Sequence, residues 1–383
     1  MFNERLEALK PFLAMEILER SQVMERNGID IVHLELGEPD FATPPPIVQA
    51  CEEALEHGMT HYTHSMGDVL LRQKLAESYY NRFQVKVQPE QIVIFPGSSL
   101  ALATLFQLLL NPGDEVILSN PGYPCYPNFV RFAGGVVQTV DTEEEDGFLY
   151  RISDVEKKIS KKTKAILINS PCNPTGIVMD GDLMESLCHL DTLIVSDEIY
   201  HGLIYGGAAD HSVLEFTKNC VVVGGFSKAY AMTGWRLGYL ILPEEVIPKF
   251  QAFMQNFVLS TNLMVQMAGI SALQECEAYV KRACAIYDER RCYLLEKLRE
   301  LGFTIPVDPK GAFYMLVNAK HLGQNSLELA LDILETVHLG VTPGIDFGSK
   351  SEGYLRISYA NSLPKLKEGM RRLEKYIEIR GKA

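Results

Sequence analysis

The middle of the chain alternates short apolar runs with helix-length segments, and this alternation constrains the fold most. The segments between several of the runs space their apolar residues at a period near 3.6, as in Leu100–Leu110 and Asp182–His189. Such alternation predicts an α/β fold in which helices sandwich a mostly parallel sheet. The predicted strands are Ile92–Phe95, Glu115–Leu118, Val136–Val140, Ala165–Ile168, Leu193–Ser196, Cys220–Gly224 and Gly238–Leu242.

The pattern changes after about residue 245, where longer helical stretches replace the alternation. We expect a large domain over residues 45–275 and a smaller α+β domain over residues 276–383, which residues 1–44 join. Pro44-Pro45-Pro46 is interpreted as a stiff connector into the large domain. The helices expected in this part are Glu245–Gln274, Ala278–Leu301, Ser326–His338 and Leu363–Ile379, and the strands are Thr304–Val307, Phe313–Val317 and Tyr354–Ser358.

Charge and cysteine content limit the partners and the compartment that we expect. The chain has 383 residues with a formal net charge of −13, which disfavours nucleic acid and anionic membrane surfaces as partners. No apolar run approaches the roughly 18 residues of a spanning helix, and the charged N-terminus does not resemble a signal peptide. The eight cysteines form no C-x-x-C pair, so we expect reduced cysteines in a cytoplasmic protein. Cys276, Cys284 and Cys292 recur every eight residues, which suggests one helix face.

Polar residues follow four of the predicted strands at the point where each strand ends. Gly97-Ser98-Ser99 follows the first strand, and Asn173, Asp197 and Lys228 follow three later ones. Ligands of open α/β sheets bind beyond the carboxyl ends of the strands, so we expect these residues to meet at one edge.

Together, these residue types are the ones that a site for pyridoxal phosphate requires. The Gly97-Ser98-Ser99 turn opens a helix and offers N–H groups and hydroxyls to a phosphate, and Arg236 could clamp the same anion. A buried carboxylate such as Asp197 can keep a pyridine nitrogen protonated. A lysine such as Lys228 can form an imine with an aldehyde and later move a proton. We expect no metal site.

Several motifs, in order from about residue 30 to 360, resemble the signatures of class I/II aminotransferases, the fold-type I pyridoxal-phosphate enzymes. The segment from Ser227 to Gly238 resembles the lysine segment of that family. The other matching motifs are Gly37-Glu38-Pro39-Asp40-Phe41, Asn173-Pro174-Thr175-Gly176, Ser196-Asp197-Glu198-Ile199-Tyr200 and Tyr354-Leu355-Arg356-Ile357-Ser358-Tyr359-Ala360.

The resemblance implies a ping-pong aminotransferase that moves an amino group between an L-amino acid and a 2-oxo acid through aldimine and ketimine intermediates. Lys228 would hold the cofactor as an internal aldimine and catalyse the proton shift. Asp197 would pair with the pyridinium nitrogen. Asn173 and Tyr200 would hydrogen-bond the phenolic oxygen, and Tyr123 would lie over the ring.

The resemblance also implies the phosphate and substrate contacts. Arg356 would clamp the substrate α-carboxylate beside Gly37 and Asn173. Tyr62 matches a tyrosine that reaches the phosphate from the other subunit, which implies a homodimer with shared active sites. The phosphate would be held by Ser98, Ser99, Ser227 and Arg236.

The chain departs from the family pattern at one position and leaves some alternatives open. Gly225 stands where many relatives have a serine, so one phosphate contact is missing. A C–S β-lyase would use the same Lys228 and Asp197. A pyridoxal-phosphate-sensing transcription regulator would need an attached DNA-binding module. Only about thirty residues precede the first signature, which disfavours this alternative. His201 is interpreted as a structural residue.

The donor is not fixed by these motifs. Some aspartate-preferring relatives carry a lysine in the phosphate loop where this chain has Ser99. Because a serine offers no charge to a distal carboxylate, the sequence favours neutral or broad donors over strict aspartate specificity. A cation elsewhere, including one from the partner subunit, is the open alternative.

Overall fold

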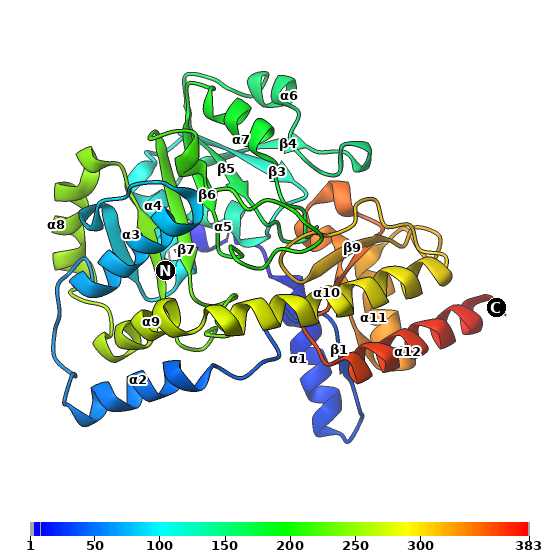
Figure 1. The fold of residues 1–383 in the computed structure, drawn as a ribbon. Helices are drawn as coiled ribbons and strands as arrows, with labels where there is room; N and C mark the ends of the chain where they lie inside the picture. The colour runs from blue at the N-terminus through cyan, green and yellow to red at the C-terminus, as the bar shows by residue number, and fades with distance from the viewer. Residues whose placement is uncertain (1–3, 8, 382–383) are drawn as a thin grey trace.

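Seven strands form the central sheet of the computed structural model, which describes residues 4–7 and 9–381. Their order is β2-β8-β7-β6-β5-β3-β4, and β8 alone runs antiparallel to its two neighbours. All seven predicted runs are strands of this sheet, and helices lie on both sides of it (Figure 1). The strands are β2 (Ile92–Phe95), β3 (Glu115–Asn120), β4 (Val136–Asp141), β5 (Thr163–Asn169), β6 (Leu193–Asp197), β7 (Cys220–Gly225) and β8 (Gly238–Ile241).

The central strands are buried on both faces because successive side chains point to opposite sides of a strand. In β2, Ile92 and Ile94 enter one hydrophobic cluster, whereas Val93 and Phe95 enter the cluster on the other face. This is why the strands read as continuous apolar runs in the sequence. The helices associated with the sheet are α2 (Pro45–Glu56), α3 (Val69–Phe83), α4 (Ser98–Leu109), α5 (Cys125–Phe132), α6 (Ile152–Glu156), α7 (Gly181–Cys188), α8 (Ile247–Phe257) and α9 (Leu263–Glu275).

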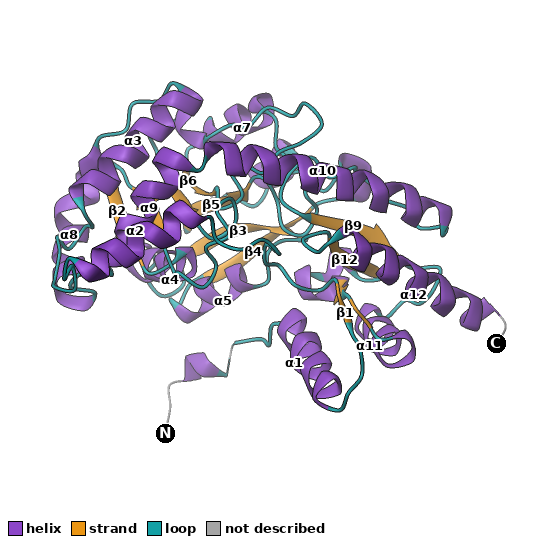
Figure 2. Cartoon of the chain, turned by 60° about the horizontal axis from the view of Figure 1, so that its bottom comes forward, coloured by secondary structure: helices purple, strands orange, loops and turns teal. Residues whose placement is uncertain are grey.

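A third hydrophobic cluster joins the two ends of the chain. β1 (Val32–His33) pairs in parallel with β10 (Leu339–Gly340), and α1 (Leu13–Arg26) packs on the same body, as Figure 2 shows. A three-stranded antiparallel sheet lies there with the order β11-β12-β9. Its strands are β9 (Tyr314–Asn318), β11 (Thr342–Pro343) and β12 (Tyr354–Ser358). The helices of this part of the chain are α10 (Glu277–Glu300), α11 (Ser326–Val337) and α12 (Leu363–Gly381). The domain boundaries at residues 44 and 275 stay a prediction.

Three expectations about secondary structure were wrong. The helix expected over Glu245–Gln274 is two helices, α8 and α9, and the loop between them contains Leu259 with a φ of 65°. Such a left-handed backbone angle cannot continue a helix. The strand expected over Thr304–Val307 is absent, and Thr304 forms only an isolated bridge with Asn318. The proline run is not a connector: Pro45 and Pro46 open α2, where the missing N–H of proline costs nothing.

The three regularly spaced cysteines do not share one helix face. A step of eight residues overshoots two helical turns by about 80°. Cys276 is therefore buried just before α10, whereas Cys292 is exposed on it. All eight cysteines are unpaired. In the described part of the chain, no helix has the length and apolarity needed to cross a bilayer.

Candidate active site

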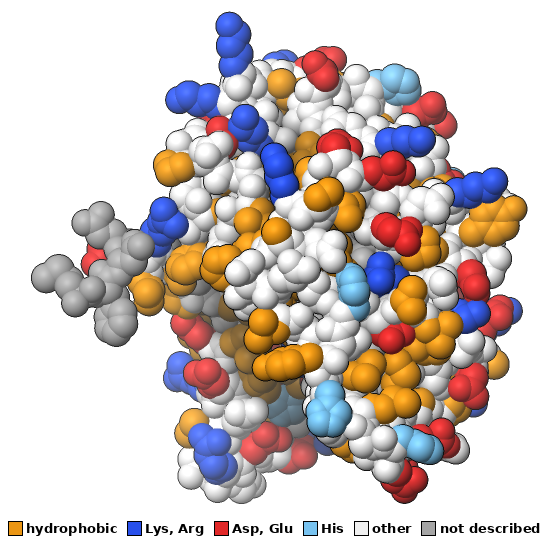
Figure 3. Space-filling view, turned by 90° about the vertical axis from the view of Figure 1, so that its left-hand side faces the viewer, with side chains coloured by type: hydrophobic (Ala, Val, Ile, Leu, Met, Phe, Trp, Pro, Cys, Tyr) orange, Lys and Arg blue, Asp and Glu red, His pale blue; other side chains and the backbone are white. Residues whose placement is uncertain are grey.

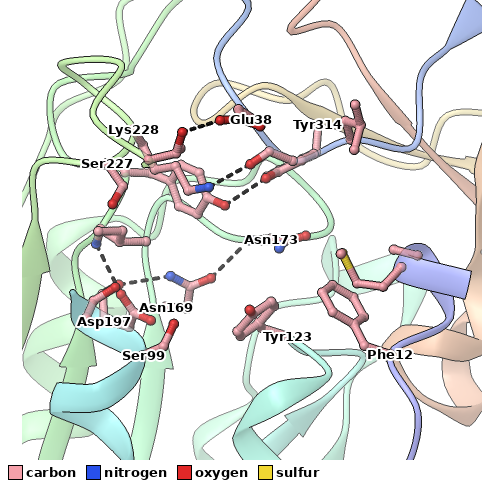
Figure 4. A pocket seen from close by; sticks show the side chains of 18 of the residues that line it. Phe12, Glu38, Ser99, Tyr123, Asn169, Asn173, Asp197, Ser227, Lys228 and Tyr314 are labelled. Carbon is pink, nitrogen blue, oxygen red and sulfur yellow. Dashed lines mark hydrogen bonds between the residues drawn. The ribbon is translucent and has the colours of Figure 1, made fainter. Parts of the chain in front are cut away.

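A cavity of about 650 Å³ lies where the carboxyl ends of the central strands face β9 and β12. It collects residues from distant parts of the sequence, as Figure 4 shows. The sheet edge therefore brings together all but one of the predicted site residues. Those that line the cavity are Gly37, Ser98, Ser99, Tyr123, Asn173, Asp197, Tyr200, Ser227, Lys228, Arg236 and Arg356.

Asp197 ends β6 and carries a buried carboxylate that has hydrogen bonds but no adjacent cation. The Tyr126 hydroxyl donates to Asp197 Oδ2 at 2.7 Å, and the Ile199 backbone N–H donates to Oδ1 at 3.1 Å. Among the described residues, no Lys, Arg or His nitrogen comes within 4.0 Å of this carboxylate. Burial raises the pKa of the Asp197 carboxyl to about 6. The site thus holds an acceptor for a cationic or protonated group.

Lys228 lies in the loop after β7 with its amine inside the cavity. Nζ donates to the backbone oxygen of Gly37 at 2.6 Å. Burial lowers the pKa of the Lys228 amine to about 8, while the negative charge of Glu38 acts in the opposite direction. About a tenth of the amine is therefore unprotonated at pH 7, far more than for an ordinary lysine, and the unprotonated amine is the form that attacks a carbonyl carbon.

Arg356 on β12 is 2% exposed and has no carboxylate partner among the described residues. Its guanidinium donates to Asn173 Oδ1 at 3.0 Å, to the backbone oxygen of Glu35 at 2.6 Å and to Thr342 Oγ1 at 3.1 Å. Nε has no hydrogen-bond partner. A buried cation bonded only to neutral oxygens is suited to receive an anionic ligand.

A second anion site is built where Gly97 precedes the N-terminus of α4. Gly97 has a φ of 91°, and a Cβ there would overlap the Arg236 guanidinium. Across the turn, a Cβ on Gly238 would lie 2.5 Å from the backbone nitrogen of Ser98. These two glycines let the guanidinium of Arg236 pack beside the first N–H groups of a twelve-residue helix, an arrangement that attracts phosphate.

The sequence did not identify two tyrosines that complete the cavity. Tyr126 binds Asp197, and its place three residues after Tyr123 at the start of a helix was an available signal. Tyr314 at the start of β9 shares a 2.8 Å hydrogen bond with the Tyr200 hydroxyl. A Cβ on Gly37 would lie 2.5 Å from the Tyr314 hydroxyl, which explains the glycine. No spacing in the sequence connects Tyr314 with these residues.

Tyr62 is the one predicted site residue that does not line the cavity. It is 82% exposed and lies beside residues 260–264, away from the other site residues of this chain. Gly225 is also absent from the cavity wall, and a Cβ there would lie 2.8 Å from Ile199 Cδ1. His201 lies outside the cavity, with Nδ1 3.3 Å from Glu198 Oε2.

The unpaired charges of the cavity fit pyridoxal phosphate together with an amino acid. Asp197 can supply a carboxylate for a pyridinium nitrogen, and Lys228 can supply an amine for the aldehyde. Arg236 and the start of α4 can receive the phosphate, which leaves Arg356 for the α-carboxylate of a substrate. Each buried charge without a protein partner thus has a counterpart on these two molecules.

Comparison with known proteins places the same cofactor chemistry in the relatives of this chain. The sequence profile of aminotransferase class I and II matches residues 29–373. The (5-formylfuran-3-yl)methyl phosphate transaminase of Methanocaldococcus jannaschii is 39% identical over 98% of this chain and 100% of its own length. The aspartate/prephenate aminotransferase of Thermus thermophilus is 38% identical over 100% of this chain and 99% of its own length. The solved structure of Thermus thermophilus aspartate aminotransferase with maleate superposes with a TM-score of 0.93 at 38% identity, covering 98% of this chain and 99% of that one.

The raised pKa of Asp197 predicts how the cofactor-free protein responds to Asp197→Asn. Because the folded pKa of about 6 exceeds the ordinary 3.8, the folded state binds more protons between these values, and the cost of the buried charge grows as pH rises through that window. The asparagine variant should therefore be more stable than wild type, by up to about 3 kcal/mol above pH 7 and by roughly half of that at pH 5. Urea unfolding of both cofactor-free proteins at the two pH values measures the difference. A variant that is less stable than wild type at both would contradict the prediction.

Proposed function

The chain belongs to the class I and II aminotransferase family, and we propose that the residues of this cavity divide its pyridoxal-phosphate-dependent chemistry among them as follows. The enzyme is an aminotransferase: it moves an amino group between an amino acid and a 2-oxo acid. Its relatives are named transaminases and aminotransferases, which favours transamination over the β-lyase alternative. The observation that carries the proposed roles is the set of three charges without an ion-pair partner among the described residues, on the buried Asp197 and Arg356 and on the partly buried Lys228.

Lys228 is the residue that attaches the cofactor covalently and then moves the proton. When bound, pyridoxal phosphate supplies an aldehyde that condenses with amines and a ring that accepts an electron pair. The Lys228 amine is positioned for the first task by its hydrogen bond to Gly37 and is partly unprotonated near neutral pH. In the loaded enzyme, Lys228 Nζ would also be the base that takes the proton from the substrate Cα.

Asp197 keeps the ring nitrogen protonated. Its carboxylate carries hydrogen bonds from Tyr126 and the Ile199 N–H that fix its orientation. Pairing with a pyridinium also relieves the cost of burying a lone carboxylate, so binding and activation of the cofactor use the same charge.

The remaining roles follow from what each side chain can donate. Asn173 and Tyr200 would hold the phenolic oxygen of the cofactor, and Tyr123 would pack against its ring. Arg356 clamps the substrate α-carboxylate, beside the backbone of Gly37, with a guanidinium fork that matches two carboxylate oxygens. The phosphate is held by Ser98, Ser99, Ser227 and Arg236.

Borohydride labelling tests the role of Lys228. Reduction of the protein loaded with pyridoxal phosphate, followed by peptide mapping, should place the label on Lys228. Lys228→Ala should fold, bind the cofactor without covalent attachment and lose at least about 10³-fold in kcat, because both nucleophile and proton carrier are removed. A matched control is Lys310→Ala, a lysine outside the cavity. A label on any other lysine would overturn the assignment.

The active unit is a homodimer in which Tyr62 completes the cavity of the partner. Tyr62 is too exposed and too far from the cavity wall to serve its own site in this chain. Met59, which lines the same hollow as Tyr62, is exposed, and so are Phe257 and Leu259, which precede residues 260–264 of that hollow in the chain. Figure 3 shows apolar patches with histidines among them on the face that carries α8. A second copy packed there would bury these side chains and deliver the Tyr62 hydroxyl to the partner's phosphate site.

Mixed dimers test the shared site. Lys228→Ala and Tyr62→Phe proteins should each be impaired, but their heterodimer contains one site free of both changes. Random mixing should therefore restore about a quarter of the wild-type activity. The matched control mixes Lys228→Ala with Arg236→Ala: both lie in one cavity, so that no heterodimer has an intact site. Demonstrated subunit exchange with equal recovery in the two mixtures, or with none, would refute sharing.

Two broader expectations complete the proposal. The eight unpaired cysteines suit a reducing compartment, and we place the enzyme in the cytoplasm. Residues 45–275 form the large domain, and residues 1–44 and 276–383 together form the small domain. The pairing of β1 with β10 supports this division.

A further inference from the structure

Helix α1 presents apolar residues in two directions. Ile17 is buried in the hydrophobic cluster that joins the chain ends. Phe12, which caps the helix, and Met15 and Leu18, spaced three residues apart, instead line the active-site cavity. Met15 remains 45% exposed. A row of apolar side chains facing a cavity is suited to cover the apolar part of a ligand.

Phe12, the first residue of this row, lies at the end of the cavity away from Asp197, the proposed partner of the cofactor ring. The Phe12 ring meets the Tyr123 ring edge-on at 6.0 Å, and Figure 4 shows Phe12 on the side opposite Asp197 and Ser99, with Tyr123 between them. The row from Phe12 to Leu18 extends about 9 Å along the helix axis. A methyl group would leave most of it uncovered, whereas a side chain the size of leucine or phenylalanine would cover it.

The cavity has no spare cation for a second carboxylate. The basic residues among its described lining are Lys228, Arg236 and Arg356, and the proposed function uses all three. Lys10, the cation nearest to Phe12 along the chain, lines a different hollow. The acidic side chain of Glu38, which accepts a hydrogen bond from Thr233, adds negative charge to the wall.

The segments that a partner would contribute with Tyr62 supply no fixed cation either. Residues 57–71 and 255–265 contain no lysine and no arginine. Residues 59–62 and 260–264 line one hollow on the surface, so they move to the partner site together. A dicarboxylic donor would therefore bury its distal carboxylate among apolar side chains without a compensating charge.

We infer that the preferred amino donor has a bulky, uncharged, apolar side chain, and that Phe12, Met15 and Leu18 of α1 determine this specificity. The inference rests on the proposed function, because it takes Arg356 as the α-carboxylate clamp. The three side chains act by covering apolar substrate surface, so their truncation reduces discrimination between donors and leaves the chemistry of Lys228 unchanged.

The test is the amino-donor half-reaction, which needs no acceptor. The enzyme loaded with pyridoxal phosphate is mixed with L-phenylalanine, L-leucine, L-alanine or L-aspartate, and the loss of the aldehyde-form absorbance gives kcat/KM for each donor. Phenylalanine and leucine should exceed both alanine and aspartate by about tenfold or more. Met15→Ala and Phe12→Ala should each lower the phenylalanine-to-alanine ratio about tenfold, and Met15→Arg should raise the rate with aspartate.

Val23→Ala is the matched control, because Val23 is an exposed apolar residue of the same helix that does not line the cavity. It should leave the ratio unchanged. Faster reaction of aspartate than of both large donors would overturn the inference while leaving the proposed function intact. A phenylalanine-to-alanine ratio that Met15→Ala does not change would do the same. No conversion with any of the four donors would overturn the proposed function, and the inference with it.

Discussion

The burial of a carboxylate without a cation beside it is the physical constraint on which the active site of this structure depends. Asp197 sits at the end of β6 with two hydrogen-bond donors, Tyr126 and the Ile199 N–H, to satisfy it. Two donors are enough to keep the group in place and too few to prevent burial from raising the pKa of its carboxyl to about 6. The fold therefore carries a charge whose natural partner is a ligand, and Arg356 repeats this arrangement with the opposite sign.

The central sheet makes such burial possible. β6 has a neighbouring strand on each side and helices on both faces of the sheet. Its last residue, Asp197, is therefore buried. Side chains that alternate between two hydrophobic clusters fix the register, and a shift by one residue would turn Asp197 to the other face. At the same edge, the missing Cβ of Gly97 leaves room for the Arg236 guanidinium, and that of Gly238 leaves room for the backbone at the start of α4. Strand geometry and backbone clearance together place four charged groups around one cavity.

Much of this could be predicted from the sequence because it is encoded locally. The seven central strands are apolar runs bounded by turn residues, and the polar residues that end them fall at one sheet edge by topology alone. The predictions fail where the structure depends on features that the local sequence pattern does not encode. The break between α8 and α9 depends on the positive φ of Leu259, which apolar periodicity does not record. Tyr314 reaches Tyr200 only because β9 packs across the cavity. Tyr62 is recognisable as a site residue by resemblance, whereas in a single chain it lies on the surface.

The central claim is that Asp197 keeps the cofactor ring protonated, and the ¹⁵N chemical shift of that ring nitrogen tests it most directly. Enzyme loaded with ¹⁵N-labelled pyridoxal phosphate should give the shift of a protonated pyridine, unchanged from about pH 6 to about pH 9, because the paired carboxylate holds the proton throughout this range. A nitrogen that titrates within the range, or that has the shift of an unprotonated pyridine at neutral pH, would contradict the account.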